Sequence, residues 1–231
     1  MTRVFSLSCP CCVLGLTLFL AGFCSWQAVQ ARSMPPAAHD EAGFIPLFDG
    51  ETLNGWIGSV DGYTVEDGAI VCIPNKGGNL YTAKEYSDFV LRLEFKLTPG
   101  ANNGIGLRAP LEGDAAYVGL ECQILDDTAP QYAGRLKNYQ YHGSIYGILP
   151  AKTGHLKPVG EWNTQEIRLE GRNVKVTLNG VVIVEGNLDD ASTPKTIDGR
   201  DHPGLARTSG HIGFLGHGSK VWFRNIRIKP L

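Results

Sequence analysis

Apolar and polar residues alternate with a period of two in several short segments of the chain. The clearest runs from Phe89 to Leu97, where every second residue is Phe or Leu and Arg92, Glu94 and Lys96 lie between them. This period turns one face of a β-strand toward a core and the other toward water. The segment is therefore predicted to be a half-buried strand.

Turn dipeptides predict two β-hairpins. Asn179-Gly180 and Asp67-Gly68 each separate two apolar runs. Asn-Gly and Asp-Gly are strong hairpin signals because both positions of the turn take positive φ. The predicted flanking strands are residues 63–66, 69–72, 174–178 and 181–185.

Glycine and proline punctuate the chain, with 29 and 13 copies among 231 residues. This composition suits short strands joined by turns better than a helical bundle. Further strands are predicted at residues 103–108, 118–125 and 221–228, and residues 127–157 read as one long loop. The pattern predicts a single all-β sandwich of the jelly-roll type, with a closed β-barrel as the competing architecture.

The amino terminus has the order of a secretory signal peptide. Arg3 precedes an apolar run over residues 13–23, and small residues surround a cleavage site after Ala31. A retained membrane anchor is the alternative, although a spanning helix needs about 20 apolar residues. The predicted organisation is a signal peptide (1–31), a flexible leader (32–42) and one folded domain (43–231).

Signal cleavage would leave a secreted or periplasmic protein with two cysteines, Cys72 and Cys122. Phe23 stands where a lipoprotein signal carries a small residue before its cysteine, Cys24, so lipid anchoring is disfavoured. Both remaining cysteines lie in apolar runs and are expected to be free, buried thiols.

The formal net charge of the chain is −2, from 21 Lys and Arg against 23 Asp and Glu. A nucleic-acid binder needs a basic face that displaces counterions, so nucleic acid is excluded as a general partner. Hydrophobic residues make up 43% of the sequence, which is enough for a packed core.

The predicted strand 118–125 carries the first candidate site. Its apolar residues share one face, which leaves Glu121 and Gln123 about 7 Å apart on the other. A carboxylate beside an amide can bind a polyhydroxylated ligand, and Asp126 follows them along the chain. A solvated sheet face is the alternative interpretation.

The predicted strand 103–108 carries the second candidate site. Its alternation turns Gly104, Gly106 and Arg108 to one face. Glycines inside a strand often mark the close approach of a ligand or of another backbone. Arg108 would then be a fixed cation beside a bare patch, and a bulge with an ordinary surface arginine is the alternative.

The predicted loop 127–157 concentrates aromatic residues and an imidazole. Residues 139–147 hold three tyrosines, including Tyr146, together with His142. Sugar rings stack on aromatic side chains, and histidine transfers protons near neutral pH. His211 and His217 lie six residues apart, about 20 Å on one straight strand, which is too far to share a metal ion.

Several catalytic motifs are absent from the sequence. It has no Gly-x-x-x-x-Gly-Lys-Ser/Thr, no His-Glu-x-x-His and no Gly-x-Ser-x-Gly. The strand with Glu121 reads Glu-x-Gln-x-x-Asp, with an amide where sandwich-fold retaining glycosidases carry a central Asp. A conventional hydrolase with paired carboxylates is therefore disfavoured.

A series of short motifs runs through the chain. They are Leu47-Phe48-Asp49-Gly50, Leu53-Asn54-Gly55-Trp56, Asp88-Phe89, Leu93-Glu94-Phe95-Lys96, Asn102-Asn103-Gly104-Ile105, residues 121–126, residues 143–146, Gly160-Glu161-Trp162-Asn163, Asn179-Gly180, Gly216-His217-Gly218 and residues 223–228. In this order, from about Phe44 to Ile228, they resemble the 3-keto-disaccharide hydrolase family. The resemblance implies a concanavalin-like jelly-roll sandwich, secreted or periplasmic, that acts on oxidised sugars.

A ketone at C3 of a glycoside acidifies the C2 proton, because the resulting carbanion is an enolate. Removal of that proton lets the C1 substituent leave, and addition of water completes net hydrolysis. One hypothesis makes His142 the base and places Arg108 on the enolate oxygen. Glu121 could exchange roles with His142, or both could hold a divalent metal ion that polarises the ketone.

The predicted partner is an oligosaccharide or glycoside, with no nucleic acid and no stable membrane span after signal cleavage. A non-catalytic, lectin-like carbohydrate-binding module and a structural cell-surface domain are the alternatives to the enzyme. The enzyme hypothesis requires Arg108, Glu121 and His142 to meet in one sugar-sized hollow. The residues predicted to bind substrate around them are Arg108, Gln123, Asp126, Tyr146, His217 and Arg224.

Overall fold

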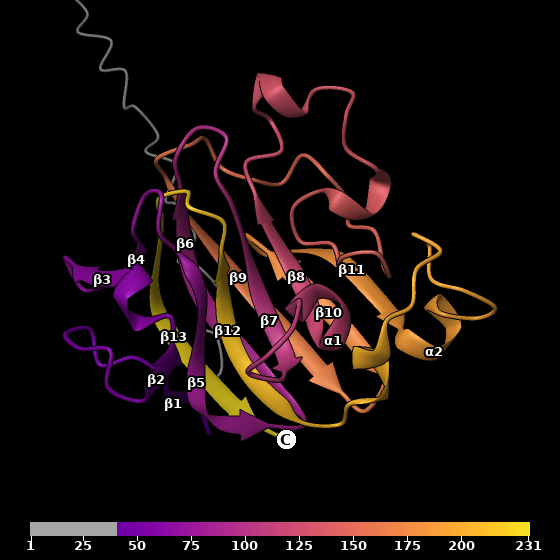
Figure 1. The fold of residues 1–231 in the computed structure, drawn as a ribbon, viewed down its shortest axis with the longest axis horizontal. Coiled ribbons are helices and arrows are strands. Elements are labelled where there is room, and N and C mark those ends of the chain that lie inside the picture. The colour runs from indigo at the N-terminus through magenta and orange to yellow at the C-terminus, as the bar shows by residue number, and fades with distance from the viewer. Residues whose placement is uncertain (1–40) are drawn as a thin grey trace, which may run out of the picture. The chain divides into compact units, whose positions relative to one another are not determined.

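This computed structural model describes residues 41–231, which fold into two antiparallel β-sheets (Figure 1). The larger sheet has the strand order β11-β10-β9-β6-β13-β4-β3, with β1 beside β13, and the smaller has the order β2-β5-β12-β7-β8. The strands of the larger sheet are β1 (Ile45–Pro46), β3 (Tyr63–Glu66), β4 (Ala69–Cys72), β6 (Phe89–Leu97), β9 (Trp162–Glu170), β10 (Asn173–Leu178), β11 (Val181–Asn187) and β13 (Val221–Pro230). Those of the smaller sheet are β2 (Trp56–Gly58), β5 (Gly78–Tyr86), β7 (Asn102–Ala109), β8 (Leu120–Leu125) and β12 (Gly210–Gly216).

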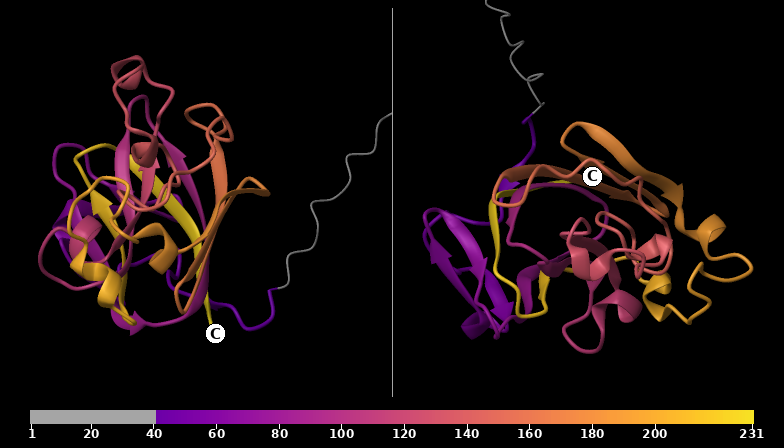
Figure 2. Two further views of the ribbon diagram at one scale, coloured as in Figure 1. Left: turned by 90° about the vertical axis from the view of Figure 1, so that its right-hand side faces the viewer. Right: turned by 90° about the horizontal axis from the view of Figure 1, so that it is seen from above.

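The two sheets lie face to face as the layers of a sandwich (Figure 2). This arrangement confirms the prediction of an all-β, jelly-roll-like sandwich of two antiparallel sheets. The helices of residues 41–231 are each one turn long and lie in the connections between strands. They are α1 (Ala115–Val118), α2 (Leu188–Ala191) and the 3₁₀ helices η1 (Val60–Gly62), η2 (Pro130–Tyr132), η3 (Asn138–Gln140) and η4 (Pro203–Ala206).

Strands with a strong local signal form where the sequence predicts them. β6 coincides with the predicted segment 89–97. The β10–β11 hairpin turns at Asn179 and Gly180, whose φ angles are 50° and 84°. Both values are positive, as a two-residue turn that matches strand twist requires. Asp67 and Gly68 join β3 to β4 in the same way, with φ angles of 49° and 74°.

The strand predicted at 118–125 starts later in the structure, because a helix forms first. The Asp114 side chain accepts a hydrogen bond from the Ala116 amide (3.1 Å) and so caps α1. Gly119 ends this helix, and β8 begins at Leu120. The helix places Tyr117 over the outer face of the smaller sheet, where it contributes to the site described below.

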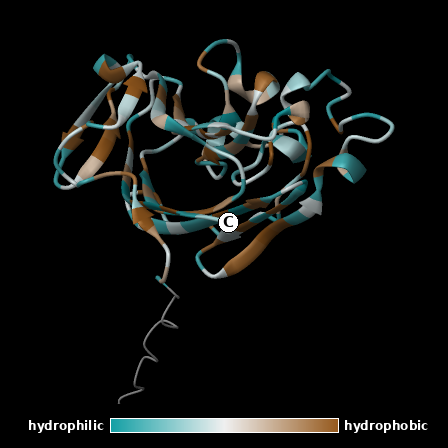
Figure 3. Cartoon of the chain, turned by 90° about the horizontal axis from the view of Figure 1, so that it is seen from below, coloured by the Kyte–Doolittle hydropathy of each residue, from teal (hydrophilic) through white to brown (hydrophobic). Residues whose placement is uncertain are grey.

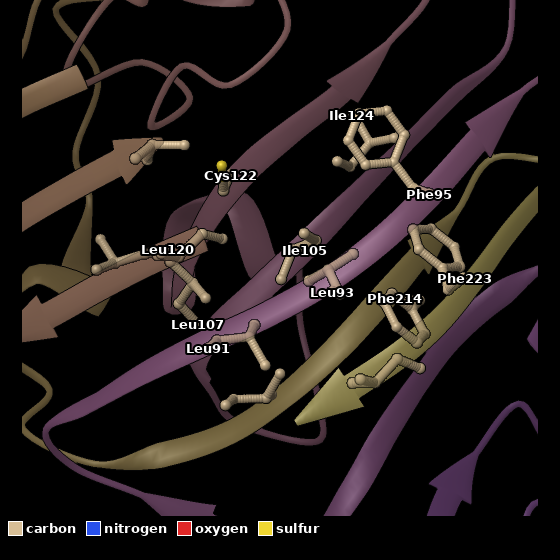
Figure 4. Packing of buried hydrophobic residues seen from close by; sticks show 14 of the residues in the cluster. Leu91, Leu93, Phe95, Ile105, Leu107, Leu120, Cys122, Ile124, Phe214 and Phe223 are labelled. Atoms are coloured by element: carbon tan, nitrogen blue, oxygen red, sulfur yellow. The ribbon is translucent and has the colours of Figure 1, made fainter. Parts of the chain in front are cut away.

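The core lies between the inner faces of the two sheets (Figure 4). Phe214 of β12 stacks on Phe223 of β13 with ring centroids 3.8 Å apart, and Trp56 of β2 stacks on Phe214 at 5.3 Å. Each large apolar side chain buried in this way contributes roughly 1.5–3 kcal/mol relative to exposure. Burial alternates along β6, β9 and β10, because one side of the larger sheet faces the core and the other faces outward; Figure 3 colours the chain by hydropathy.

The remaining expectations for the chain as a whole have mixed outcomes. Cys72 and Cys122 are free and buried, as predicted.

Glu41, assigned to the leader by the sequence, forms salt bridges with Arg92 and Arg227. Within residues 41–231, no helix is long and apolar enough to span a membrane. The predicted signal peptide and most of the predicted leader lie outside the described residues, so cleavage and secretion stay predictions.

Candidate functional site

A hollow of about 400 Å³ lies on the outer face of the smaller sheet, away from the sandwich core. This volume is within the range of small-molecule sites. Strands β7 and β8 contribute to the hollow, together with α1, the long loop after β8 and the residues around Arg200 and His217. The lining residues are Asn102, Asp114, Ala116, Tyr117, Glu121, Gln123, Leu125, Tyr132, Leu136, Gln140, Tyr146, Arg200 and His217.

The long loop extends the smaller sheet beyond β8. The Tyr146 amide donates to the Glu121 carbonyl (2.9 Å), and the Gln123 backbone bonds Ser144 (2.9 Å) and Gly143 (2.8 Å). Residues 143–146 therefore run along the open edge of β8. This pairing brings Tyr146 next to Glu121, so the predicted loop does contribute to the candidate site.

Glu121 is a buried carboxyl group that faces the hollow. Its side chain lies against Gly104 of β7, where an added Cβ would be 2.0 Å from Oε1. Only 5% of the residue is exposed. Burial, and then the negative charge of Asp114, raise the pKa of Glu121 to about 8.

Three polar side-chain oxygens in the hollow have no hydrogen-bond partner among the described residues. They are Oδ1 of Asn102, Oε1 of Glu121 and Oε1 of Gln123. An unpaired buried polar atom is costly, and native structures contain few of them. Three together on one sheet face form an acceptor surface for a ligand that carries several hydroxyl groups.

His217 and Tyr146 also line the hollow. Burial lowers the pKa of His217, and the charge of Asp114 opposes that effect in part. A neutral imidazole can donate one hydrogen bond and accept another. The Tyr146 hydroxyl accepts a hydrogen bond from Gln140 (3.0 Å), which fixes its ring in the wall.

The prediction that Arg108, Glu121 and His142 meet in one hollow is wrong for His142. Its ring lies in the sandwich interior, where Nδ1 accepts from the Leu125 amide (3.3 Å) and Nε2 is 3.1 Å from Oε1 of Gln165. Only 3% of the residue is exposed, and Phe95 lies 5.0 Å from its ring. Burial lowers the pKa of His142 to about 3, so the ring is neutral at physiological pH.

The prediction is also wrong for Arg108, because β7 has a bulge. Gly106 pairs with Gly213 and Ala109 with His211, so β7 carries one extra residue. Arg108 takes a φ of 48° and turns inward. Its guanidinium binds Asp88 (2.7 Å) and the carbonyls of Ser87 (2.8 Å) and Gly171 (3.0 Å), so it ties the turn between β5 and β6 to the turn between β9 and β10.

Besides Arg108, two more predicted substrate-binding residues lie outside the hollow. Arg224 is on the outer face of the larger sheet, paired with Glu94 (2.8 Å) and 3.9 Å from the Trp162 ring. Asp126 accepts from the Gly100 amide (2.7 Å) and from Thr128, and so stabilises a turn. The structure therefore brings together four predicted site residues, which are Glu121, Gln123, Tyr146 and His217.

Sequence reasoning missed Asn102, Asp114, Tyr117 and Arg200. Asp114 could have been found, because an Asp directly before an Ala-Ala pair can cap a helix. Arg200 has no such signal, since it lies on an irregular segment after α2. Within residues 41–231, no group of three or more His, Cys, Asp or Glu side chains is placed to hold a metal ion.

The fold and the site define an all-β sandwich with a ligand-sized, polar hollow on the outer face of one sheet. The chain belongs to the 3-keto-alpha-glucoside-1,2-lyase-like domain family, whose profile matches residues 43–229. This match confirms the resemblance found in the sequence, and membership supports a carbohydrate-active function.

Individual relatives agree with this assignment. A 3-keto-disaccharide hydrolase from Bacteroides thetaiotaomicron is 30% identical over 83% of this chain and 80% of its own. The crystal structure of a candidate glycosyl hydrolase from Parabacteroides distasonis is 33% identical, with a TM-score of 0.71 over 81% of this chain and 99% of that one. A Bacillus subtilis protein of unknown function with a galectin-like fold, 14% identical with a TM-score of 0.55 over 80% of this chain and 94% of its own, supports the fold alone.

Proposed function

We propose that this protein cleaves the glycosidic bond of 3-keto-glycosides or 3-keto-disaccharides by elimination followed by hydration. The observation that carries the proposal is Glu121, a buried carboxyl in a sugar-sized hollow, with a pKa near 8 and an unpartnered oxygen. The description of the family and the name of the Bacteroides relative support the substrate class.

Glu121 acts as the general base in this proposal. Its ionised carboxylate takes the proton from C2, and the electron pair of that bond forms the C2–C3 enolate. A carboxylate with a pKa near 8 is a stronger base than an ordinary glutamate, which favours removal of a carbon-bound proton. Gln123, Asn102 and His217 offer the hydrogen bonds that orient the ring hydroxyls.

Collapse of the enolate completes the cleavage. The C3 carbonyl reforms, a double bond forms between C1 and C2, and the C1–oxygen bond breaks. The departing oxygen takes a proton and leaves as an alcohol. Water then adds its oxygen to C1 and a proton to C2, which gives the free 3-keto-sugar.

Direct hydrolysis by two carboxylates has weaker support. Asp114 lines the hollow together with Glu121, but its Oδ1 accepts the hydrogen bond that caps α1. Glycosidases of that kind need both carboxyl groups free on either side of the scissile bond. Elimination needs only one base, because the ketone supplies the acidity.

Turnover in D₂O separates the two routes. The wild type is expected to cleave a 3-keto-disaccharide but not the unoxidised parent sugar, and the product should carry deuterium at C2. The free 3-keto-sugar, incubated alone in D₂O, corrects for spontaneous exchange. E121Q should lose at least 100-fold in kcat, whereas E170Q, at an exposed residue paired with Arg168, should be unaffected.

Three results would contradict the proposal. Equal cleavage of the parent disaccharide would indicate direct hydrolysis, and cleavage without deuterium at C2 would exclude proton abstraction. Tight sugar binding without any product would identify a lectin-like module.

A further inference from the structure

Arg200 is an exposed cation at the hollow that pairs with no carboxylate among the described residues. It lines the hollow, and no carboxylate among residues 41–231 forms a salt bridge with it. Its guanidinium carbon lies 4.0 Å from the centroid of the Tyr117 ring, and Nη1 donates to the Tyr117 hydroxyl. The remaining N–H groups of its planar fork are available to a ligand.

A buried contact between the side chains of His202 and Asp198 lies behind Tyr117 on the protein side. The His202 ring lies 4.9 Å from the Tyr117 ring, and its Nε2 is 3.1 Å from Oδ2 of Asp198. The side chains of His202 and Asp198 are 0% and 2% exposed. Gly147 leaves the room for this pair, since an added Cβ would be 2.5 Å from Oδ2 of Asp198.

Asp198 also fixes the backbone that carries the arginine. Its Oδ1 accepts from the Arg200 amide (3.0 Å) and from the Thr196 hydroxyl (2.9 Å). One buried carboxylate therefore holds both the main chain of Arg200 and, through His202 and Tyr117, its side chain. A surface arginine without a role in binding needs no such support, because long charged side chains gain little from a fixed geometry.

We propose that Arg200 stabilises the enolate oxygen at C3, and that Tyr117, His202 and Asp198 are positioning residues for it. The inference rests on the proposed elimination, which develops negative charge on that oxygen. Arg108 cannot supply the charge because it lies in the sandwich interior. A preorganised cation aimed at developing charge lowers the barrier more than it strengthens substrate binding.

Substitution of Arg200 tests the role of its charge. R200Q is expected to lower kcat on a 3-keto-disaccharide about 100- to 1,000-fold, with KM changed less than about fivefold. R200K, which keeps a point charge but loses the fork, should recover part of the loss. R168Q is the control, since Arg168 is an exposed arginine outside the hollow, and its kcat should match the wild type.

A double-mutant cycle tests the positioning. D198N, which preserves the shape of the side chain, should lower kcat about tenfold in the wild type but less than about twofold in R200Q, because both act through one group. Y117F, which keeps the ring and removes only the hydroxyl, provides a second cycle if D198N does not fold. Thermal unfolding of each variant identifies losses that come from unfolding.

The outcomes separate this inference from the proposed function. Absence of turnover by the wild type contradicts the elimination and the enolate role together. Wild-type turnover with an equally active R200Q overturns the role of Arg200 alone. Independent, additive losses in both cycles overturn the positioning by Tyr117, His202 and Asp198.

Discussion

Glu121 combines two properties that a surface glutamate does not have. It is almost fully buried, and Asp114 adds a like charge nearby. Both effects disfavour its ionised form, which raises the pKa of Glu121 to about 8. The same burial makes the carboxylate a stronger base once it is ionised. The site therefore gains reactivity, while the buried carboxyl group lowers the stability of the folded protein.

The pH profile of the enzyme should report this carboxyl group. A base must be ionised to act, so kcat/KM is expected to rise with pH through about 8 and then level off. D114N removes the neighbouring charge while an Asn still caps α1, so its profile should shift toward lower pH. Steady-state kinetics between pH 5 and 10 on the 3-keto substrate would measure both curves.

E94Q provides the control, because Glu94 lies on the outer face of the larger sheet, paired with Arg224. Its profile should match the wild type. A rising limb near pH 4.5 in the wild type, or no shift in D114N, would show that Glu121 is not the base.

At the scale of single side chains, strand alternation predicts only which residues of one strand share a face of the sheet. It places Glu121 and Gln123 together correctly, because both lie on one regular strand. It makes no prediction for His142, which lies in the predicted loop 127–157 and whose orientation depends on contacts with Gln165 of β9 and Phe95 of β6, far away in the sequence. It fails for Arg108, because a bulge changes which face a residue takes.

The pairing of β7 with β8 explains why residue 104, which the sequence analysis singled out, is a glycine. Gly104 and Gly106 lie opposite Gln123 and Glu121 in this register. The sequence suggested that such glycines admit a ligand or another backbone. In the structure Gly104 instead makes room for the Glu121 side chain, which could not lie flat on the sheet otherwise.

G104A should therefore displace the catalytic carboxyl. An added Cβ at Gly104 would lie 2.0 Å from Oε1 of Glu121, and the φ of Gly104 is not positive, so the side chain moves rather than the backbone. We expect kcat/KM to fall at least tenfold. G106A is the control, because its Cβ would meet Leu215 at 3.3 Å, a contact that a flexible leucine can relieve. Equal activity of both variants would show that the position of Glu121 is not critical.

Local turn chemistry and long-range pairing differ in how well a sequence reveals them. The hairpins at Asn179-Gly180 and Asp67-Gly68 are encoded by two residues each, and both form as predicted. The extension of the sheet by residues 143–146 depends on backbone pairing with β8, and no residue pattern in the loop predicts this pairing. The candidate site therefore depends on long-range pairing that short sequence motifs do not predict.

For the molecule as a whole, the sandwich interior contains a histidine that links stability to pH. Burial lowers the pKa of His142 to about 3 from its ordinary value of 6.5. Between these values the unfolded chain binds a proton that the folded protein does not. Stability is therefore lost as pH falls below 6.5, by about 1.4 kcal/mol per pH unit from this group alone.

H142Q should flatten this dependence while it preserves turnover. Glutamine does not titrate, so the free energy of unfolding, measured with urea between pH 7 and 4, should fall less steeply than in the wild type. H155Q is the control, since His155 lies outside the core, and its slope should match the wild type. An unchanged slope in H142Q would show that the ring is protonated in the folded protein. A 100-fold loss of kcat in folded H142Q would mean instead that His142 takes part in proton transfer, although its ring lies on the core side of β8.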